Sequence, residues 1–234
     1  MGPEARLVEV RKNVLRQNDV VARELRERFR RAGVLTVSLV SSPGSGKTAF
    51  LEKVLTCFNG EYRVAALVGD LATENDGLRL ARSGAPVKQI TTGTLCHLEA
   101  SMVQKALESW QLPKLDFLFI ENVGNLVCPS SYDLGESLRL VLMSVTEGED
   151  KPLKYPTIFN SADIAVVTKM DLAEAVEFDE ATALANIQAV RPGMQVFKLS
   201  AKSGDGVEPF LQYLRCQKRD VQAARFPGAG SGIL

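Results

Sequence analysis

The strongest chemical signal in this chain is the octapeptide Ser-Ser-Pro-Gly-Ser-Gly-Lys-Thr at residues 41–48. It fits the phosphate-binding pattern G-x-x-x-x-G-K-S/T, except that Ser41 replaces the first glycine. An apolar run at 34–40 precedes the octapeptide and a helical stretch follows it. That order aims backbone N–H groups and a helix N-terminus at an anion. We therefore predict that residues 41–48 hold the phosphates of a purine nucleoside triphosphate.

Individual residues of this loop have distinct predicted roles. Its two glycines allow the backbone to approach the phosphates closely. Lys47 would reach the β- and γ-phosphates, and the hydroxyl of Thr48 would bind Mg²⁺. The residues predicted to contact the nucleotide here are Gly44, Ser45, Gly46, Lys47, Thr48 and Ala49.

Two carboxylates stand at the ends of apolar runs, where they could reach a magnesium ion and the attacking water. Glu121 follows the run at 117–120, and Asp70 follows the run at 63–68 after one glycine. Gly124 occupies the position of a glycine that senses the γ-phosphate. Either acid could instead cap a helix or a turn. The predicted catalytic residues are Lys47, Asp70 and Glu121, and the predicted ligands of Mg²⁺ are Thr48, Asp70 and Glu121.

Two later segments indicate the identity of the base. The run at 164–168 leads into Thr168-Lys169-Met170-Asp171, which resembles the N-K-x-D element of GTPases with threonine in place of asparagine. The aspartate of that element accepts two hydrogen bonds that adenine cannot donate, so ATP would leave it unpaired. The run at 195–199 delivers Ser200-Ala201-Lys202, which is similar to the last guanine-binding motif of GTPases. We predict GTP rather than ATP, held by Lys169, Asp171, Ser200, Ala201 and Lys202.

A second chemistry is carried by cysteine and histidine. The single histidine, His97, follows Cys96, and Cys128 lies later in the chain. Both segments follow apolar runs, so they should lie near the ligand-binding edge of the sheet. Thiolate and imidazole together favour Ni²⁺ or Zn²⁺ over hard cations. Three ligands are one short of a closed structural zinc site, which favours an open site or one completed by a second subunit. A cysteine can also be a small buried hydrophobe, as we expect for Cys57 and Cys216.

Apolar runs predict the elements that must position these residues. Strand-length runs at 34–40, 63–68, 87–90, 117–120, 138–144, 164–168 and 195–199 alternate with helical stretches at 49–55, 74–82, 98–110, 180–190 and 208–214. Continuous apolar runs are typical of parallel strands buried on both faces. The predicted fold class is therefore α/β: a three-layer P-loop NTPase domain with a doubly wound, mostly parallel sheet.

Composition and spacing divide the chain into three parts. Helical spacing over 4–31 predicts an N-terminal helix that Gly33 ends. We expect a helical extension at 1–32, a GTPase domain at 33–218 and a flexible tail at 219–234. The 28 basic residues balance the 28 acidic ones, which gives no indication of nucleic acid or a membrane surface. No apolar run approaches the roughly 18 residues of a membrane-spanning helix, and we expect a cytoplasmic protein.

Four segments together resemble a known family, the hydrogenase nickel-incorporation GTPases, often called HypB. They are the loop at 41–48, Thr-Gly-Thr-Leu-Cys-His-Leu-Glu-Ala at 92–100, Phe-Ile-Glu-Asn-Val-Gly-Asn-Leu-Val-Cys-Pro at 119–129, and Ser-Val-Thr-Glu-Gly-Glu-Asp-Lys-Pro-Leu-Lys-Tyr-Pro at 144–156. The family belongs to the dimerising branch of P-loop GTPases, and its phosphate loop shares the Ser41 departure.

The resemblance implies a GTPase that couples GTP binding and hydrolysis to nickel loading or release during maturation of nickel–iron hydrogenase. It implies Ni²⁺ or Zn²⁺ on Cys96, His97 and Cys128, near the interface of a GTP-dependent homodimer. A lysine of the 151–154 stretch would reach the partner subunit's nucleotide site. The implied partners are a nickel-handling maturation factor and the hydrogenase large-subunit precursor.

Two features of the chain qualify this resemblance. Residues 1–32 contain neither cysteine nor histidine, so the extra N-terminal nickel site of many relatives should be absent. The basic N-terminal helix is instead a candidate docking surface for a separate metallochaperone. The motifs place no catalytic arginine or glutamine, so we expect a low intrinsic rate of hydrolysis.

Alternatives from other classes stay open at this point. One is an ATP-dependent dimerising ATPase of the same branch, such as a partitioning or reductase protein. Another is a urease-type nickel GTPase, although those relatives have a proline between the metal-site cysteine and histidine, whereas Cys96 and His97 are adjacent. A third is a metal-binding protein in which hydrolysis is incidental.

Overall fold

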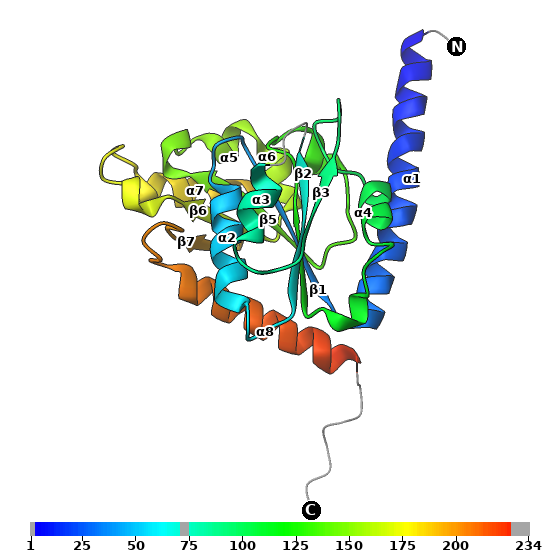
Figure 1. The fold of residues 1–234 in the computed structure, drawn as a ribbon. Coiled ribbons are helices and arrows are strands. Elements are labelled where there is room, and N and C mark those ends of the chain that lie inside the picture. Colours follow the sequence, from blue (N-terminus) through cyan, green and yellow to red (C-terminus); the bar gives the residue numbers. More distant parts are fainter. Residues whose placement is uncertain (1–2, 71–74, 226–234) are drawn as a thin grey trace, which may run out of the picture.

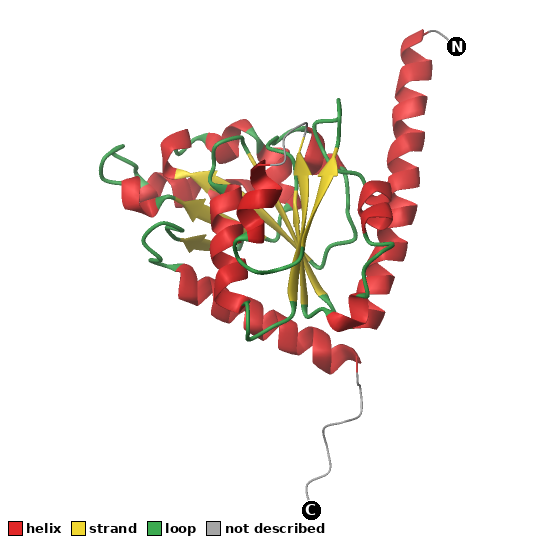
Figure 2. Cartoon of the chain, viewed as in Figure 1, coloured by secondary structure: helices red, strands yellow, loops and turns green. Residues whose placement is uncertain are grey.

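A seven-stranded sheet forms the centre of the molecule, with helices against both of its faces (Figure 1 and Figure 2). The computed structural model describes residues 3–70 and 75–225. The strands are β1 (Leu35–Ser41), β2 (Val64–Asp70), β3 (Val87–Thr91), β4 (Phe117–Glu121), β5 (Leu138–Ser144), β6 (Ile164–Thr168) and β7 (Gln195–Lys198). Their order across the sheet is β3-β2-β4-β1-β5-β6-β7, and every neighbouring pair is parallel. The predicted α/β class with a parallel sheet is confirmed.

Helices lie between most successive strands, as crossovers in a parallel sheet require, and one further helix precedes the first strand and another follows the last. They are α1 (Pro3–Ala32), α2 (Lys47–Phe58), α3 (Asn75–Ala81), α4 (Ala100–Ala106), α5 (Lys151–Lys154), α6 (Pro156–Ser161), α7 (Glu180–Val190) and α8 (Val207–Arg225). Short 3-10 turns are η1 (Leu112–Lys114), η2 (Cys128–Ser131), η3 (Val145–Glu147) and η4 (Met170–Leu172). None of the helices described within 3–70 and 75–225 is long and apolar enough to cross a membrane.

Alternate side chains of the strands supply the two halves of the core, because successive residues of a strand point to opposite faces. Leu35, Val37 and Leu39 of β1 pack in a cluster with α2, α3 and α8. On the other face, α1 and α4 pack against Leu118 and Ile120 of β4. The helices α6 and α7 cover Val141 of β5 and Ala165 of β6 on that same side. This arrangement gives the three layers.

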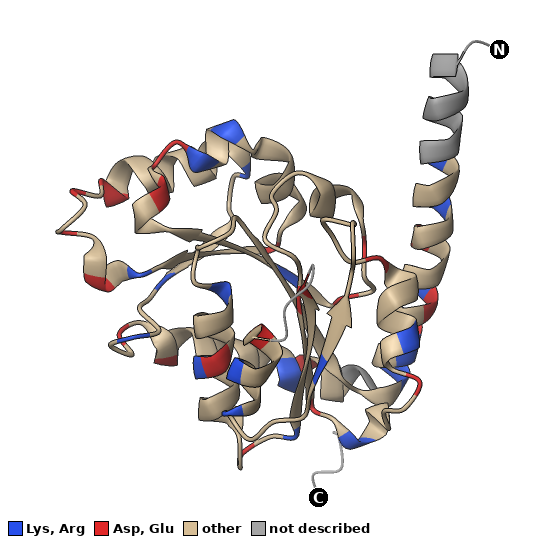
Figure 3. Cartoon of the chain, turned by 45° about the horizontal axis from the view of Figure 1, so that its top comes forward, with Lys and Arg blue, Asp and Glu red and all other residues tan. Residues whose placement is uncertain are grey.

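Helix α1 is integrated into the domain over its C-terminal half. Ala22, Leu25 and Phe29 are almost fully buried and pack with α4 in one cluster. The N-terminal end of α1 extends beyond the rest of the molecule (Figure 1). Basic and acidic residues are interspersed along the described part of this helix and along the other elements visible in Figure 3. The helix thus has a docked half and a projecting half.

Helix α8 differs from the prediction at its C-terminal end. It continues to Arg225, so residues 219–225, which we expected in a flexible tail, are helical. Contacts with the body of the domain continue along this part of the helix, since Lys218 is buried and Val221 packs against the core. The remainder of the predicted tail, residues 226–234, lies outside the described residues.

Because all seven strands are parallel, their carboxyl ends meet at one edge of the sheet. The strands β1 and β4 lie side by side in the centre, and β2 and β5 flank them. The segments that follow β1, β2, β4, β6 and β7 carry the residues that the sequence predicts to bind nucleotide. The fold therefore brings these residues to one end of the molecule.

Candidate nucleotide and metal sites

The loop between β1 and α2 is shaped by two glycines and a buried serine. Gly44 and Gly46 have φ of 76° and 87°, a conformation that side chains with a Cβ rarely adopt. Ser41, which stands where the motif has glycine, is fully buried; its hydroxyl donates to Ser42 O at 2.8 Å and accepts from Ser45 Oγ at 2.6 Å. Ser41 does not have a positive φ, so the position does not require glycine.

The loop forms one wall of a hollow of about 590 Å³. The residues lining this hollow include nine that the sequence predicts to bind nucleotide or Mg²⁺: Gly44, Ser45, Gly46, Lys47, Thr48, Ala49, Asp70, Gly124 and Lys169. Two further charged residues of α3, Asp76 and Arg79, also line it. Neither residue was predicted from the sequence, although both follow Asp70 by one short loop. Arg79 donates to the Glu52 carboxylate at 2.7 Å.

A carboxylate lies beneath this hollow in a site suited to Mg²⁺. Glu121 Oε1 accepts from Thr48 Oγ1 at 2.7 Å and lies 3.7 Å from Lys47 Nζ. Glu121 is 1% exposed, and its Oε2 makes no hydrogen bond with any described residue. Burial raises the pKa of this carboxyl, while Lys47 and Thr48 act in the opposite direction. A hydroxyl beside an unsatisfied carboxylate oxygen is a donor set that fits a magnesium ion.

Gly124 brings the segment after β4 into contact with the phosphate loop. A Cβ at this position would lie 3.1 Å from both Pro43 Cα and Pro43 N. The absence of a side chain therefore lets the two backbones approach each other. This contact makes the segment after β4 a direct neighbour of the phosphate site.

A second, smaller hollow of about 250 Å³ continues from the loop toward β6 and β7. The guanine candidates Lys169, Asp171, Ser200, Ala201 and Lys202 all line it. Ser200 Oγ donates to Asp171 Oδ1 at 2.6 Å, which holds the carboxylate in place. A fixed carboxylate in this hollow suits a purine base that presents N–H donors.

Thr168 and Lys169 connect this hollow to the phosphate loop. The buried Thr168 hydroxyl donates to Ser45 O at 2.6 Å, and Lys169 Nζ donates to Gly44 O at 2.7 Å. Lys169 has a φ of 58°, and its stem passes 3.5 Å from where a Cβ of Gly46 would be. Threonine in place of the usual asparagine therefore makes a contact with the loop backbone.

The predicted metal ligands come together on the segments after β3 and β4. The ligand atoms of Cys96, His97 and Cys128 all lie within 4.8 Å of one another. The two sulfurs are 3.0 Å apart, and Cys96 Sγ is 3.9 Å from His97 Nδ1. Soft sulfur with imidazole is a donor set for Ni²⁺ or Zn²⁺.

The environment of His97 favours the neutral form of its imidazole. It is buried, and its ring packs on Tyr132 with centroids 3.9 Å apart. Its Nε2 makes no hydrogen bond with the described residues and lies 3.8 Å from Glu99 Oε1. Burial lowers the pKa of His97, and Glu99 partly opposes this shift. Metal ions bind the neutral imidazole, so a lowered pKa favours binding near neutral pH.

Two asparagines join the ligand-bearing segments to each other. The buried Asn122 accepts from the backbone N–H of Leu98 at 2.9 Å. Asn125 Nδ2 donates to Cys96 O at 3.3 Å. Both asparagines lie on the segment between Glu121 and Cys128. The segment that approaches the phosphate loop thus also fixes the backbone on either side of His97.

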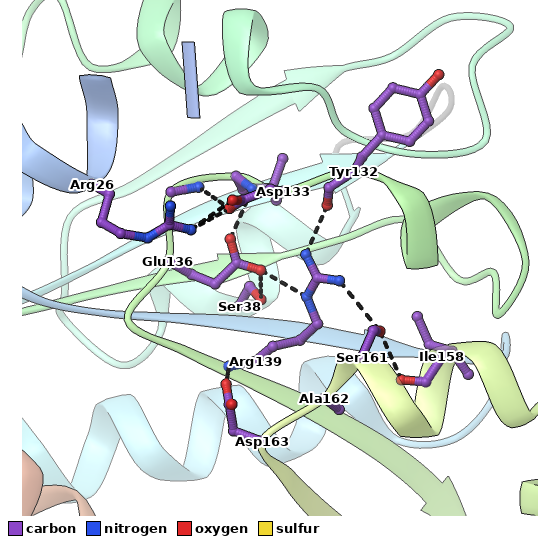
Figure 4. A network of polar contacts seen from close by, with 12 residues as sticks. Arg26, Ser38, Tyr132, Asp133, Glu136, Arg139, Ile158, Ser161, Ala162 and Asp163 are labelled. Atoms are coloured by element: carbon purple, nitrogen blue, oxygen red, sulfur yellow. Dashed lines mark hydrogen bonds and ion pairs between the residues drawn. The ribbon is translucent and has the colours of Figure 1, made fainter. Parts of the chain in front are cut away.

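A buried polar network anchors the far end of the Cys128 segment (Figure 4). Arg139 Nη2 donates to Tyr132 O at 2.8 Å, and Arg139 Nε donates to Glu136 Oε1 at 2.7 Å. The same carboxylate oxygen accepts from Ser38 Oγ at 2.9 Å. The network ties Tyr132, and with it the ring against His97, to β1 and β5.

Comparison with known proteins places this geometry in a family. Residues 35–198 match the family model described as "CobW/HypB/UreG, nucleotide-binding domain". The chain belongs to this family. The hydrogenase maturation factor HypB of Rhizobium leguminosarum bv. viciae is 43% identical over 222 residues, which cover 95% of this chain and 73% of that protein. The hydrogenase/urease maturation factor HypB of Helicobacter pylori (strain ATCC 700392 / 26695) is 42% identical, over 91% of this chain and 89% of that protein.

Solved HypB structures have the same fold. The crystal structure of HypB from Helicobacter pylori in complex with nickel is 43% identical, has a TM-score of 0.83, and covers 87% of this chain and 96% of its own. HypB from Archaeoglobus fulgidus is 37% identical with a TM-score of 0.80, over 86% and 98% of the two chains. The resemblance to HypB proteins drawn from the four sequence segments is confirmed.

Proposed function

We propose that this HypB-family protein is a GTPase that couples GTP binding and hydrolysis to nickel loading or release during maturation of nickel–iron hydrogenase. The observation that carries the proposal is that one short segment serves both chemistries. It begins at the buried Glu121, passes the phosphate loop at Gly124 and ends at the thiol of Cys128. A cytoplasmic location and the hydrogenase large-subunit precursor as recipient are parts of this proposal.

The nucleotide half assigns roles to the loop and its neighbours. Backbone N–H groups of residues 44–48 and the ammonium group of Lys47 stabilise the phosphate charge by position, which is the main source of catalysis in phosphoryl transfer. Thr48, Asp70 and Glu121 would hold Mg²⁺, which neutralises phosphate charge when bound. Asp70 and Glu121 would also orient the attacking water, with Gly124 sensing the γ-phosphate.

The base half favours GTP. Asp171, fixed by Ser200 at 2.6 Å, can accept the paired N–H donors of guanine and finds no such pair on adenine. Lys169 stacks its stem along the base, and Ala201 and Lys202 form the far wall. Adenine would leave this carboxylate without its pair of donors, which would penalise ATP.

The metal half rests on Cys96, His97 and Cys128. These three ligands leave at least one coordination position for an exchangeable ligand or a second subunit. The side chains beside the cysteines, Leu95 and Val127, are large, apolar and exposed. We therefore propose a homodimer that buries these two side chains and completes the site. The similar HypB of Helicobacter pylori crystallised in complex with nickel, which supports Ni²⁺ as the cargo, and Zn²⁺ would fit the same donors.

One lysine is better placed than the other to reach a partner subunit's nucleotide. Lys151 lies 3.2 Å from Glu147 Oε1 and over the ring of Tyr155, and its side chain is 18% exposed. Lys154 is 63% exposed and pairs only across one turn with Asp150. We propose Lys154 for the contact with the partner.

The test measures metal content and oligomeric state together. The full chain with Ni²⁺ is examined by metal analysis and light scattering, once with GDP and once with a non-hydrolysable GTP analogue. We expect a nickel-containing dimer with the analogue and a weaker dimer or weaker nickel binding with GDP. Cys96→Ser should remove the nickel, whereas Cys216→Ser, outside the cluster, should not. A metal-free monomer in every condition would refute the nickel half and leave the GTPase half standing.

A further inference from the structure

Asn18 of helix α1 lies buried between the two segments that carry the metal-binding candidates. Its Nδ2 donates to Asp133 O at 2.8 Å, and its Oδ1 accepts from the backbone N–H of Ala100 at 2.8 Å. Asp133 is five residues after Cys128, and Ala100 is three residues after His97. Because a carbonyl can only accept and an N–H can only donate, these partners fix the orientation of the carboxamide. One side chain therefore bridges both segments.

The bond to Ala100 completes the N-terminus of helix α4. The first N–H groups of a helix have no partner within the helix. Glu99, at the capping position of α4, makes no side-chain cap. Asn18 supplies that cap from another helix and is itself 7% exposed. The start of α4, directly after Cys96 and His97, thus depends on α1 for its position.

The segment after Cys128 is pressed onto the same part of α1. A Cβ at Gly135 would lie 2.7 Å from Ala22 O and 2.8 Å from Leu25 Cβ. Arg26 Nη2 donates to both carboxylate oxygens of Asp133, at 2.6 and 2.7 Å (Figure 4). These contacts leave the segment little freedom to move independently of α1.

We propose that Asn18 is a positioning residue for the metal site, which sets the spacing of the Cys96–His97 segment relative to Cys128. The inference rests on the proposed metal site and extends it to a helix that contributes no ligand. Because linkage is reciprocal, metal on the three ligands stabilises the docking of α1, and displacement of α1 loosens the metal.

The first experiment compares Asn18→Leu with Asn13→Leu in the full chain. The control makes the same change at an exposed position of the same helix. Nickel affinity is measured by competition with a chromophoric chelator, and the thiolate-to-nickel charge-transfer spectrum is recorded at saturating metal. We expect Asn18→Leu to bind nickel about tenfold more weakly, with a shifted spectrum, as for loss of a group that orients a ligand. The affinity of Asn18→Leu for a GTP analogue should stay within about twofold of that of the unmodified chain. A general folding defect would instead weaken nickel and nucleotide binding together. Asn13→Leu should match the unmodified chain.

Two further measurements guard against a variant that fails to fold. Asn18→Asp keeps the acceptor for Ala100 and loses the donor to Asp133. Its nickel affinity should therefore lie between that of Asn18→Leu and that of the unmodified chain. In the unmodified chain, nickel should slow amide exchange in residues 16–24 of α1. Unmodified affinity and spectrum in Asn18→Leu, an equal loss of nucleotide binding, or unchanged exchange in 16–24 would each overturn the inference. If the unmodified chain binds no nickel, the nickel half of the proposed function fails as well.

Discussion

At the scale of single residues, Glu121 shows how a binding site opposes stability. Its carboxylate is buried with one oxygen hydrogen-bonded by Thr48 and the other without a partner among the described residues. Burial raises the pKa of Glu121 above its usual value of 4.5. The folded state therefore holds this proton to higher pH than the unfolded state does. As pH rises from about 4.5 through the raised pKa, the contribution of Glu121 to stability falls.

The raised pKa of Glu121 leads to a prediction for Glu121→Gln. The amide removes a desolvated charge, so at pH 8 the nucleotide-free variant should melt a few degrees higher than the unmodified chain. The same change removes a proposed ligand of Mg²⁺, so stabilisation by GTP with Mg²⁺ should largely disappear. Thermal melts with and without GTP and Mg²⁺ test both halves. A lower melting temperature without nucleotide would show that the pair with Lys47 outweighs the burial of the charge.

Asp171 supports a second prediction at this scale. Asp171→Ala should weaken binding of GTP by about 100-fold, since two hydrogen bonds to a charged acceptor are lost. Binding of ATP should change by less than about threefold, because adenine does not use this carboxylate. Ser200→Ala, which only frees the carboxylate to rotate, should have a smaller effect. Competition with labelled GDP measures all three chains; equal losses for both bases would argue against Asp171 as the discriminator.

At the scale of elements, the strands were predictable because each is a continuous apolar run. All seven predicted strands are present, and β5 and β6 have the predicted bounds. The helices were less predictable. The helix expected at 98–110 is confined to Ala100–Ala106, and α5 and α6 were not predicted. Both of these short helices have proline in their first turn, where proline is favoured but also resembles a turn signal.

The residues of the candidate sites also fall into a predictable and an unpredictable group. Motif residues could be predicted, because spacing after a strand places them at one edge of the sheet. The clustering of Cys96, His97 and Cys128 follows from that placement. By contrast, Asn18 and Arg79 were not predicted as site residues. Their roles arise from contacts between helices and loops that are distant in sequence, and no local pattern encodes such contacts.

Gly124 carries the prediction for the segment between β4 and η2. In Gly124→Ala the added Cβ would meet the backbone of Pro43 at 3.1 Å, so the segment must move by a few tenths of an ångström. We expect at least about tenfold weaker binding of a GTP analogue and slower hydrolysis, with GDP binding nearly unchanged. Nickel affinity should no longer differ between the two nucleotide states. The idea fails if the variant keeps the full difference in nickel affinity between GDP and the analogue.

At the scale of the whole molecule, a cluster of three charged residues, Lys218, Asp116 and Arg63, connects the last helix to the amino-terminal ends of the central strands. Lys218 of α8 donates to Gly33 O at 2.8 Å and to Asp116 O at 2.9 Å. Asp116 lies just before β4 and forms a bidentate pair with Arg63, just before β2. Gly33 follows α1, so the contacts of Lys218, Asp116 and Arg63 join the end of α1 and the C-terminal half of α8 to the starts of β2 and β4. The cluster lies at the opposite end of the strands from the nucleotide site, so its loss should affect stability and spare binding.

The last prediction follows from the ionisation of Asp116. Burial alone would raise its pKa, but hydrogen bonds from Arg63 and the charge of Lys218 outweigh burial and lower the pKa to about 2. The unfolded state, with a pKa near its usual 3.8, therefore binds more protons between pH 4 and pH 2, and the stabilisation is lost as pH falls through that range. Asp116→Asn should lower the free energy of unfolding by about 2 kcal/mol at pH 7 and by about half as much at pH 3. Urea denaturation at both pH values measures the difference. Asp220→Asn, at an exposed position of α8, is the matched control and should stay within about 0.5 kcal/mol of the unmodified chain. A destabilisation by Asp116→Asn that does not shrink toward pH 3 would mean that packing, and not the charge, makes this position stabilising.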